Sequence, residues 1–142
     1  MTQPRRVLFL CTGNSARSQM AEAIVNARLG GDWQAQSAGT HPAGFVHPLA
    51  VRALAEIGID HQGRSKSVEA MRDRSFDLVV TVCDSAAEEC PLWLGSGRRA
   101  HLDFPDPAKT PGSEEDQRAA FRAVRDGMLR QLPAVLQEAT GA

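Results

Sequence analysis

The chain has 142 residues, and its 16 Lys and Arg against 17 Asp and Glu give a formal net charge of −1. This length suits one domain, residues 1–142, and the balanced charge excludes the basic surface typical of proteins that bind nucleic acid or anionic membranes. Three cysteines at 11, 83 and 90 are too few and too widely spaced for a disulfide-stapled secreted scaffold. The apolar run 7–11 is shorter than a signal-peptide core or a membrane span. We therefore expect a cytoplasmic protein that does not bind a membrane.

Apolar runs alternate with helical periodicities along the chain. The predicted elements, in chain order, are a buried strand over 7–10, a helix from 18 to a stop at 30, a short strand over 33–37, a helix from 48 to 58, strands over 76–82 and 99–102, and a long C-terminal helix capped by Ser113. Pro133 is expected to kink this last helix or end it early.

This alternation predicts an α/β fold, a three-layer sandwich built on a four-stranded parallel sheet. Ligands of such folds bind beyond the carboxyl ends of the strands. Cys11 ends the first predicted strand and Cys83 follows the strand over 76–82. We therefore expect these two cysteines at one edge of the sheet.

The loop between the first strand and the first helix has the composition of an anion site. Its backbone N–H groups can form a concave cradle at the positive end of the helix dipole. Gly13 is expected to supply unusual backbone dihedrals, Asn14 tolerates left-handed ones, and the Arg17 fork can hold two oxygens at once. The residues expected to bind an oxyanion are Thr12, Gly13, Asn14, Ser15, Ala16, Arg17 and Ser18.

The same positive field should favour the thiolate form of Cys11. Ser18 is expected to donate its hydroxyl to this thiolate and also to cap the helix. In the alternative interpretation, Cys11 is a small buried apolar residue, Arg17 a surface charge and Ser18 an ordinary cap. Neither a Walker motif nor a Gly-x-Gly-x-x-Gly motif occurs, so nucleotide binding is unsupported.

These motifs together resemble a known family. The segment 11–22, Ser37-Ala38-Gly39 and Asp106-Pro107 resemble the low-molecular-weight protein tyrosine phosphatase superfamily. Within it, Val82-Cys83, Cys90-Pro91 and the segment 106–108 look like the thioredoxin-coupled arsenate reductases. The resemblance extends from residue 5 to about residue 136, with its motifs in the expected order.

The resemblance implies a mechanism. Cys11 would attack arsenate held by the loop and Arg17, while Asp106 protonates the departing hydroxide. Cys83 would then attack the adduct, release arsenite and form a disulfide with Cys11. Cys90 would next attack Cys83, leaving a Cys83–Cys90 disulfide for thioredoxin to reduce. The implied electron donor is thioredoxin, with a glutaredoxin as the open alternative, and no tightly bound cofactor is implied.

The proposed relay sets a structural demand. If the residues between Cys83 and Cys90 were helical, the two Cα atoms would lie about 10 Å apart. A disulfide needs Cα atoms within about 7 Å. The segment 84–91 should therefore loop out during turnover and be among the least stable parts of the fold. The sequence Gly95-Ser96-Gly97 is a candidate hinge, or equally a plain surface turn.

One departure concerns the family's potassium site. Its residues match Asn14, Glu22 and Ser37, but the acidic side chain expected near Ser67 is absent. We hypothesise that the ammonium of Lys66 takes the place of the metal cation, pairs with Glu22 and supports the loop through Asn14. The equally weighted alternative has Lys66 solvated and Glu22 as a first-turn helix acid.

The general acid and the overall function each have a second candidate. Asp103 is the fallback for the general acid Asp106. The rival functions are a phosphatase for phosphotyrosine or small phosphoesters and a non-catalytic oxyanion-binding module. Ala108 and Lys109 follow the Asp-Pro pair, and the chain has no tyrosine, so a wall that stacks on a phenyl ring is expected to be missing. No metal ligand set is predicted among the histidines. Phosphate and sulfate are expected to bind as analogues of arsenate. We expect the protein to be a monomer.

Overall fold

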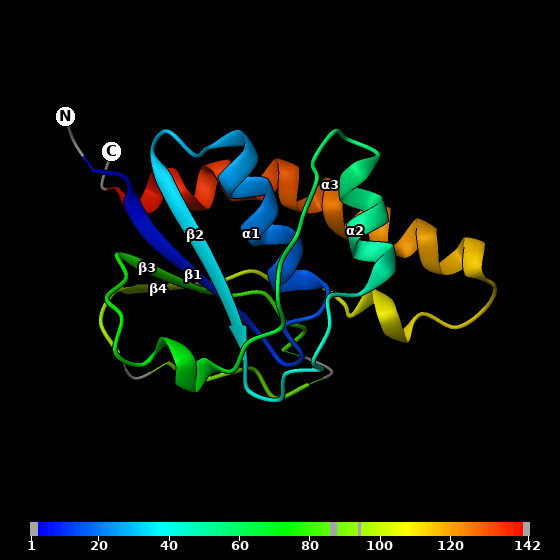
Figure 1. Cartoon of the computed structure of the whole chain (residues 1–142), viewed down its shortest axis with the longest axis horizontal. Helices are drawn as coiled ribbons and strands as arrows, with labels where there is room; N and C mark the ends of the chain where they lie inside the picture. The colour runs from blue at the N-terminus through cyan, green and yellow to red at the C-terminus, as the bar shows by residue number, and fades with distance from the viewer. Residues whose placement is uncertain (1–2, 86–87, 94, 141–142) are drawn as a thin grey trace.

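The computed structural model describes residues 3–85, 88–93 and 95–140. Four parallel strands form one sheet with the order β2-β1-β3-β4 (Figure 1). The strands are β1 (Arg5–Cys11), β2 (Trp33–Gly39), β3 (Leu78–Thr81) and β4 (Arg98–His101). The central strand β1 is the apolar run predicted from the sequence, and its residues Val7 to Cys11 are buried. The α/β class and the parallel sheet are confirmed.

Three α-helices cover one face of the sheet (Figure 1). They are α1 (Arg17–Arg28), α2 (Pro48–Ala55) and α3 (Glu114–Ala139). Alternate residues of β1, such as Val7 and Phe9, pack with Ile24 of α1 and with Phe121 and Leu132 of α3 in the main hydrophobic core. Because β1 is buried on both faces, it places its last residue at a rigid edge of the sheet.

A smaller core lies on the opposite face. Leu8 and Leu10 of β1 pack there with Met71, Phe76 and Trp93. Met71 belongs to the 3-10 helix η1 (Val68–Met71), so short irregular elements form this third layer in the described part of the chain. A second 3-10 helix, η2 (Pro107–Lys109), follows β4. The face that carries η1 is therefore thinner than the helical face.

The prediction that Pro133 could end the last helix early was wrong. The helix α3 runs from Glu114 to Ala139 with Pro133 inside it. Leu132 and Leu136 are buried on either side of the proline, and their packing against the core holds the helix together despite the missing N–H. Its start is as predicted, because Ser113 and Asp116 form a capping box.

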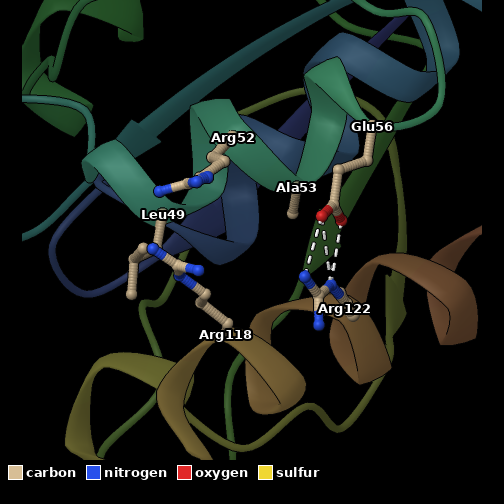
Figure 2. A pocket seen from close by; sticks show the side chains of 6 residues that line it. All are labelled: Leu49, Arg52, Ala53, Glu56, Arg118 and Arg122. Carbon is tan, nitrogen blue, oxygen red and sulfur yellow. Dashed lines mark hydrogen bonds and ion pairs between the residues drawn. The ribbon is translucent and has the colours of Figure 1, made fainter. Parts of the chain in front are cut away.

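Ion pairs join α2 to α3 around a small hollow (Figure 2). Arg122 donates to both oxygens of Glu56, at 2.9 to 3.2 Å, and Arg125 donates to Glu56 at 2.8 Å. These hydrogen bonds lower the pKa of Glu56 to about 2, with Arg122 the leading cause. These ion pairs hold the end of α2 against α3. In the described part of the chain, no helix is both long and apolar enough to cross a membrane.

Candidate active site

The loop after β1 turns its carbonyl groups outwards. The backbone oxygens of Thr12, Gly13 and Ser15 each accept a hydrogen bond of 2.9 Å, from the N–H groups of His41, Ala43 and His47 respectively. The loop backbone is thus fastened to the segment between β2 and α2. Among the described residues, the N–H groups of Gly13, Asn14 and Ser15 have no backbone acceptor, so they are available to an anion.

The unusual dihedral of the loop is at Asn14, whose φ is 45°. The expectation that Gly13 would supply it was wrong, because Gly13 has no positive φ and an added Cβ there would meet nothing closer than 4.0 Å. The glycine that the loop requires is Gly39, at the end of β2. A Cβ at Gly39 would lie 2.5 Å from the Thr12 oxygen and 2.9 Å from the Asn14 nitrogen. Only glycine lets β2 approach the loop this closely.

Cys11 is the free cysteine, and it is buried at the end of β1. Its Sγ lies 2.8 Å from the Oγ of Ser18, which in turn accepts from Nδ2 of Asn14 at 2.8 Å. With Asn14 donating to its oxygen, the Ser18 hydroxyl is placed to donate its own proton to a Cys11 thiolate. The expected cap at Ser18 was wrong: Ala16 is the N-cap of α1 and no side chain caps it, since the Ser18 hydroxyl is engaged with Cys11.

A buried amide holds the loop from behind. Nε2 of Gln19 donates to Asn14 Oδ1 at 3.0 Å and to the Arg64 carbonyl at 2.8 Å. Oε1 of Gln19 lies 2.8 Å from Nε2 of His61. Burial is the leading reason why the pKa of His61 is lowered. Gln19 stands inside the motif quoted for the family, but the sequence did not identify its supporting role.

Lys66 and Glu22 lie side by side behind the loop. Nζ of Lys66 is 3.8 Å from Oε1 of Glu22 and donates to the Arg64 carbonyl at 2.8 Å, while Ser37 donates to the same Glu22 oxygen at 2.9 Å. The support of Asn14 comes from the Lys66 backbone, whose N–H donates to Asn14 Oδ1 at 2.7 Å. Burial lowers the pKa of Lys66, and the charge of Glu22 opposes this shift. The ammonium therefore pairs with Glu22, and the contact with Asn14 belongs to the main chain.

Arg17 points away from solvent and binds a carboxylate. Its two terminal nitrogens contact the two oxygens of Glu88, Nη2 at 3.1 Å, and Nη1 also donates to the Phe104 carbonyl at 3.1 Å. Glu88 also accepts from the Thr12 hydroxyl at 2.9 Å and from the Asp84 N–H at 2.8 Å. Burial opposes ionisation of Glu88, but these hydrogen bonds outweigh it and lower its pKa to about 2. The carboxylate thus occupies the fork that the sequence assigned to an oxyanion.

Cys83 and Cys90 form a disulfide with their Cα atoms 6.0 Å apart. The described residues between them, 84–85 and 88–89, are not helical, as this bond requires, and residues 86–87 lie outside the described part of the segment. The disulfide follows β3, at the edge of the sheet where β1 ends. The contacts of Glu88 tie this segment to the loop that carries Cys11.

The two candidate acids have different partners. Oδ2 of Asp106 lies 3.8 Å from Arg17, and its other oxygen accepts from the Ala108 N–H at 3.0 Å. Asp103 is engaged elsewhere, with His101 at 2.7 Å and with the hydroxyl of Ser85 at 2.8 Å. Hydrogen bonding to His101 is the leading cause that lowers the pKa of Asp103 to about 2. Asp106 is therefore the acid beside the anion loop.

A hollow of about 400 Å³ joins the loop to the disulfide. Thr12, Glu88, Cys90 and Lys109 are among its lining residues, and none of the lining residues is Phe, Trp or Tyr. One exposed aromatic residue, Phe45, has its ring centroid 6.4 Å from that of His47, with the two rings tilted by 37°. The sequence missed the contacts of Glu88 because an isolated glutamate carries no motif.

A family model matches residues 6–140 of the chain and describes the low molecular weight phosphotyrosine protein phosphatase. Arsenate reductase from Halalkalibacterium halodurans is 46% identical over 127 residues, which is 89% of this chain and 91% of that protein. Arsenate reductase from Bacillus subtilis strain 168 is 43% identical over the same shares.

Solved structures give the same result. An arsenate reductase in the phosphate binding state has a TM-score of 0.79 at 26% identity and covers 95% of this chain and 98% of that chain. An arsenate reductase in the oxidized state has a TM-score of 0.77 at 25% identity with the same coverage. On the family match and on these relatives, the chain belongs to the low molecular weight phosphotyrosine protein phosphatase family and to its arsenate reductase branch.

Proposed function

We propose that this protein reduces arsenate to arsenite with Cys11 as nucleophile and Cys83 and Cys90 as a disulfide relay. The observation that carries the proposal is the Cys83–Cys90 disulfide, held beside the Cys11 loop by Glu88. A phosphatase needs one nucleophilic cysteine, whereas reduction of As(V) to As(III) consumes two electrons, which one dithiol supplies.

The first step uses the loop. The N–H groups of residues 12–17 and the Arg17 fork would hold arsenate, or its analogues phosphate and sulfate, once Glu88 has left that fork. The Cys11 thiolate, stabilised by the Ser18 hydroxyl, attacks arsenic. Asp106, beside Arg17, protonates the hydroxide that leaves.

The next steps transfer the electrons. The Cys83 thiolate attacks Sγ of Cys11, the sulfur–arsenic bond breaks, and its electron pair remains on arsenic, which leaves as arsenite. Cys90 then attacks Cys83, releases Cys11 as thiolate and forms the disulfide seen here. Thioredoxin is the proposed dithiol donor. The chemistry needs no tightly bound cofactor. One chain carries every residue of the relay, which is consistent with a monomer. The need for a dithiol donor is consistent with a cytoplasmic location.

The test couples arsenate reduction to NADPH oxidation through thioredoxin and thioredoxin reductase. Wild-type protein should oxidise NADPH when arsenate is added, and the Cys11→Ser, Cys83→Ser and Cys90→Ser variants should lose multiple turnover. Replacing thioredoxin with glutaredoxin and glutathione identifies the donor. Undiminished turnover of the Cys83 or Cys90 variant would remove the relay from the mechanism.

One observation favours the second candidate, a phosphatase. The exposed ring of Phe45 lies beside the ring of His47. Burial lowers the pKa of His47, and the negative charge of Asp106 opposes this shift. An aromatic side chain at this edge could contact an aryl phosphate. Hydrolysis of p-nitrophenyl phosphate that is faster than arsenate reduction and that falls in Phe45→Ala would favour the phosphatase.

A further inference from the structure

A histidine lies against the disulfide. The Sγ atoms of Cys83 and Cys90 and a ring nitrogen of His101 all lie within 4.8 Å of one another. The two sulfurs are bonded to each other, so in this state the three atoms are not a metal ligand set. His101 is the last residue of β4 and is paired in register with Thr81 of β3, which leads directly to Cys83. The sheet itself therefore delivers the imidazole to the disulfide.

The imidazole is held on both of its nitrogens. Nδ1 lies 2.6 Å from the Thr81 hydroxyl, and Nε2 lies 2.7 Å from Oδ1 of Asp103. The same Asp103 oxygen accepts from the Ser85 N–H at 3.1 Å and from its hydroxyl at 2.8 Å. Ser85 stands two residues after Cys83. Asp103 thus connects the histidine to the chain segment that carries the disulfide.

We propose that the His101 imidazolium stabilises the thiolate that leaves when a dithiol reduces the Cys83–Cys90 disulfide. A thiolate of the donor attacks one sulfur, and the electron pair of the broken bond goes to the other sulfur. The second thiol of the donor then attacks the donor sulfur of this mixed disulfide and releases the protein cysteine as a thiolate. Both cysteines are then reduced, and the donor carries the disulfide. A cation beside the leaving sulfur makes it a better leaving group. Because His101 lies within 4.8 Å of both sulfurs, it serves attack on either one.

Other charged groups lie near the disulfide. Arg99 lines the groove that His101 shares with Pro91, and His41, Glu88, Glu89 and Lys109 line the hollow beside Cys90. Among these groups, only His41 is of the residue type whose charge ordinarily changes between pH 5.5 and 8.5, so it is tested beside His101. A dependence on pH in this range that is lost with His101 therefore reports the imidazole.

The experiment follows the reduction of the oxidised protein by dithiothreitol, a small dithiol that needs no docking surface. The rate is measured by thiol alkylation at pH 5.5 to 8.5 for wild type, His101→Asn and the control His41→Asn, which removes the histidine that lines the hollow beside Cys90 without belonging to the cluster of His101 and the two sulfurs. We expect wild type to exceed His101→Asn about tenfold at pH 6, with the ratio falling towards one at pH 8.5 as the ring loses its proton. The control should follow wild type.

A ratio that stays constant with pH would overturn the proposal, because a purely structural histidine acts equally at every pH. Equal rates for wild type and His101→Asn at every pH would also overturn it. The inference rests on the proposed reductase, and the two fail separately. Pre-reduced wild type should form arsenite in a single turnover, and its failure in this assay would refute the reductase alone.

Discussion

Replacing Glu88 with glutamine should strengthen sulfate binding to the oxidised protein. In this state both oxygens of Glu88 contact Arg17, and the Thr12 hydroxyl donates to one of them at 2.9 Å. An oxyanion that binds the Arg17 fork must first displace this carboxylate. Glutamine keeps the shape of the side chain and one acceptor oxygen but removes the negative charge, so it competes less well for Arg17.

The expected gain follows from these contacts. A hydrogen bond between charged groups contributes about 1.5–3 kcal/mol, and a neutral one contributes about half as much. Replacing a doubly contacted carboxylate by an amide should therefore weaken the internal competitor by about 1.5–3 kcal/mol. Each 1.4 kcal/mol is a factor of about ten in affinity. We expect the Kd for sulfate to fall by about ten- to a hundredfold.

Calorimetric titration of the oxidised protein with sulfate at pH 7 and fixed ionic strength measures this change. Sulfate is a suitable probe because its charge is constant near neutral pH. The matched control is Glu89→Gln, which removes the same charge from the neighbouring residue. If the two variants bound sulfate equally, general electrostatics would explain the effect and the direct competition by Glu88 would be refuted. The gain should also shrink after reduction, when the disulfide no longer holds the segment of Glu88 at the loop.

Four further outcomes are expected. Arg17→Lys should weaken sulfate binding to the reduced protein by about ten- to a hundredfold in the same titration, because lysine cannot contact two oxygens in a fork. Lys66→Met should lower the free energy of unfolding in urea by about 1 kcal/mol, because the ion pair with Glu22 is lost. The Tm of the wild type should be equal in KCl and NaCl, and a Tm that rises only in KCl would contradict the Lys66 ammonium as the cation. The difference in Tm between wild type and Glu88→Gln should be constant above pH 4.5 and vanish as the pH falls towards about 2, because Glu88 has a depressed pKa in the folded state. Pro133→Ala should raise the free energy of unfolding in urea by about 1–3 kcal/mol, since it restores an N–H inside α3 at an exposed position, and no rise would show that the helix tolerates the proline without strain.

The sequence allowed the frame of the site to be predicted because a few local signals determine it. The apolar run that forms β1 is buried on both faces, and helical spacing begins close to Arg17, so the loop between them had to lie at the carboxyl edge of a parallel sheet. The contact of Ser18 with Cys11 was also predictable, since a hydroxyl in the first turn of the helix can reach back to the strand end that precedes the loop.

The details that failed depend on neighbours that are distant in sequence. The loop needs glycine at position 39 and not at 13, because β2 presses against the loop backbone, and this approach is a property of the sheet register. Lys66 supports Asn14 through its backbone N–H, although the side-chain charge had suggested the ammonium. The sequence shows which side chains can form an ion pair or a hydrogen bond. The contacts of backbone groups depend on how the chain folds, which the sequence does not show directly.

The disulfide shows how one predicted constraint leads to contacts that were not predicted. The spacing of Cys83 and Cys90 implied that the segment between them must leave the helical conformation, and the Cα distance of 6.0 Å agrees with this. Once the segment loops out, Glu88 binds Arg17 and Thr12, and Ser85 binds Asp103 beside His101. In the disulfide state the segment therefore holds a carboxylate in the anion loop, while the β3–β4 register holds the histidine at the sulfurs. We therefore expect the enzyme to bind its oxyanion more tightly after the disulfide is reduced, and the sulfate affinities of the two redox states test whether the relay and the loop are coupled.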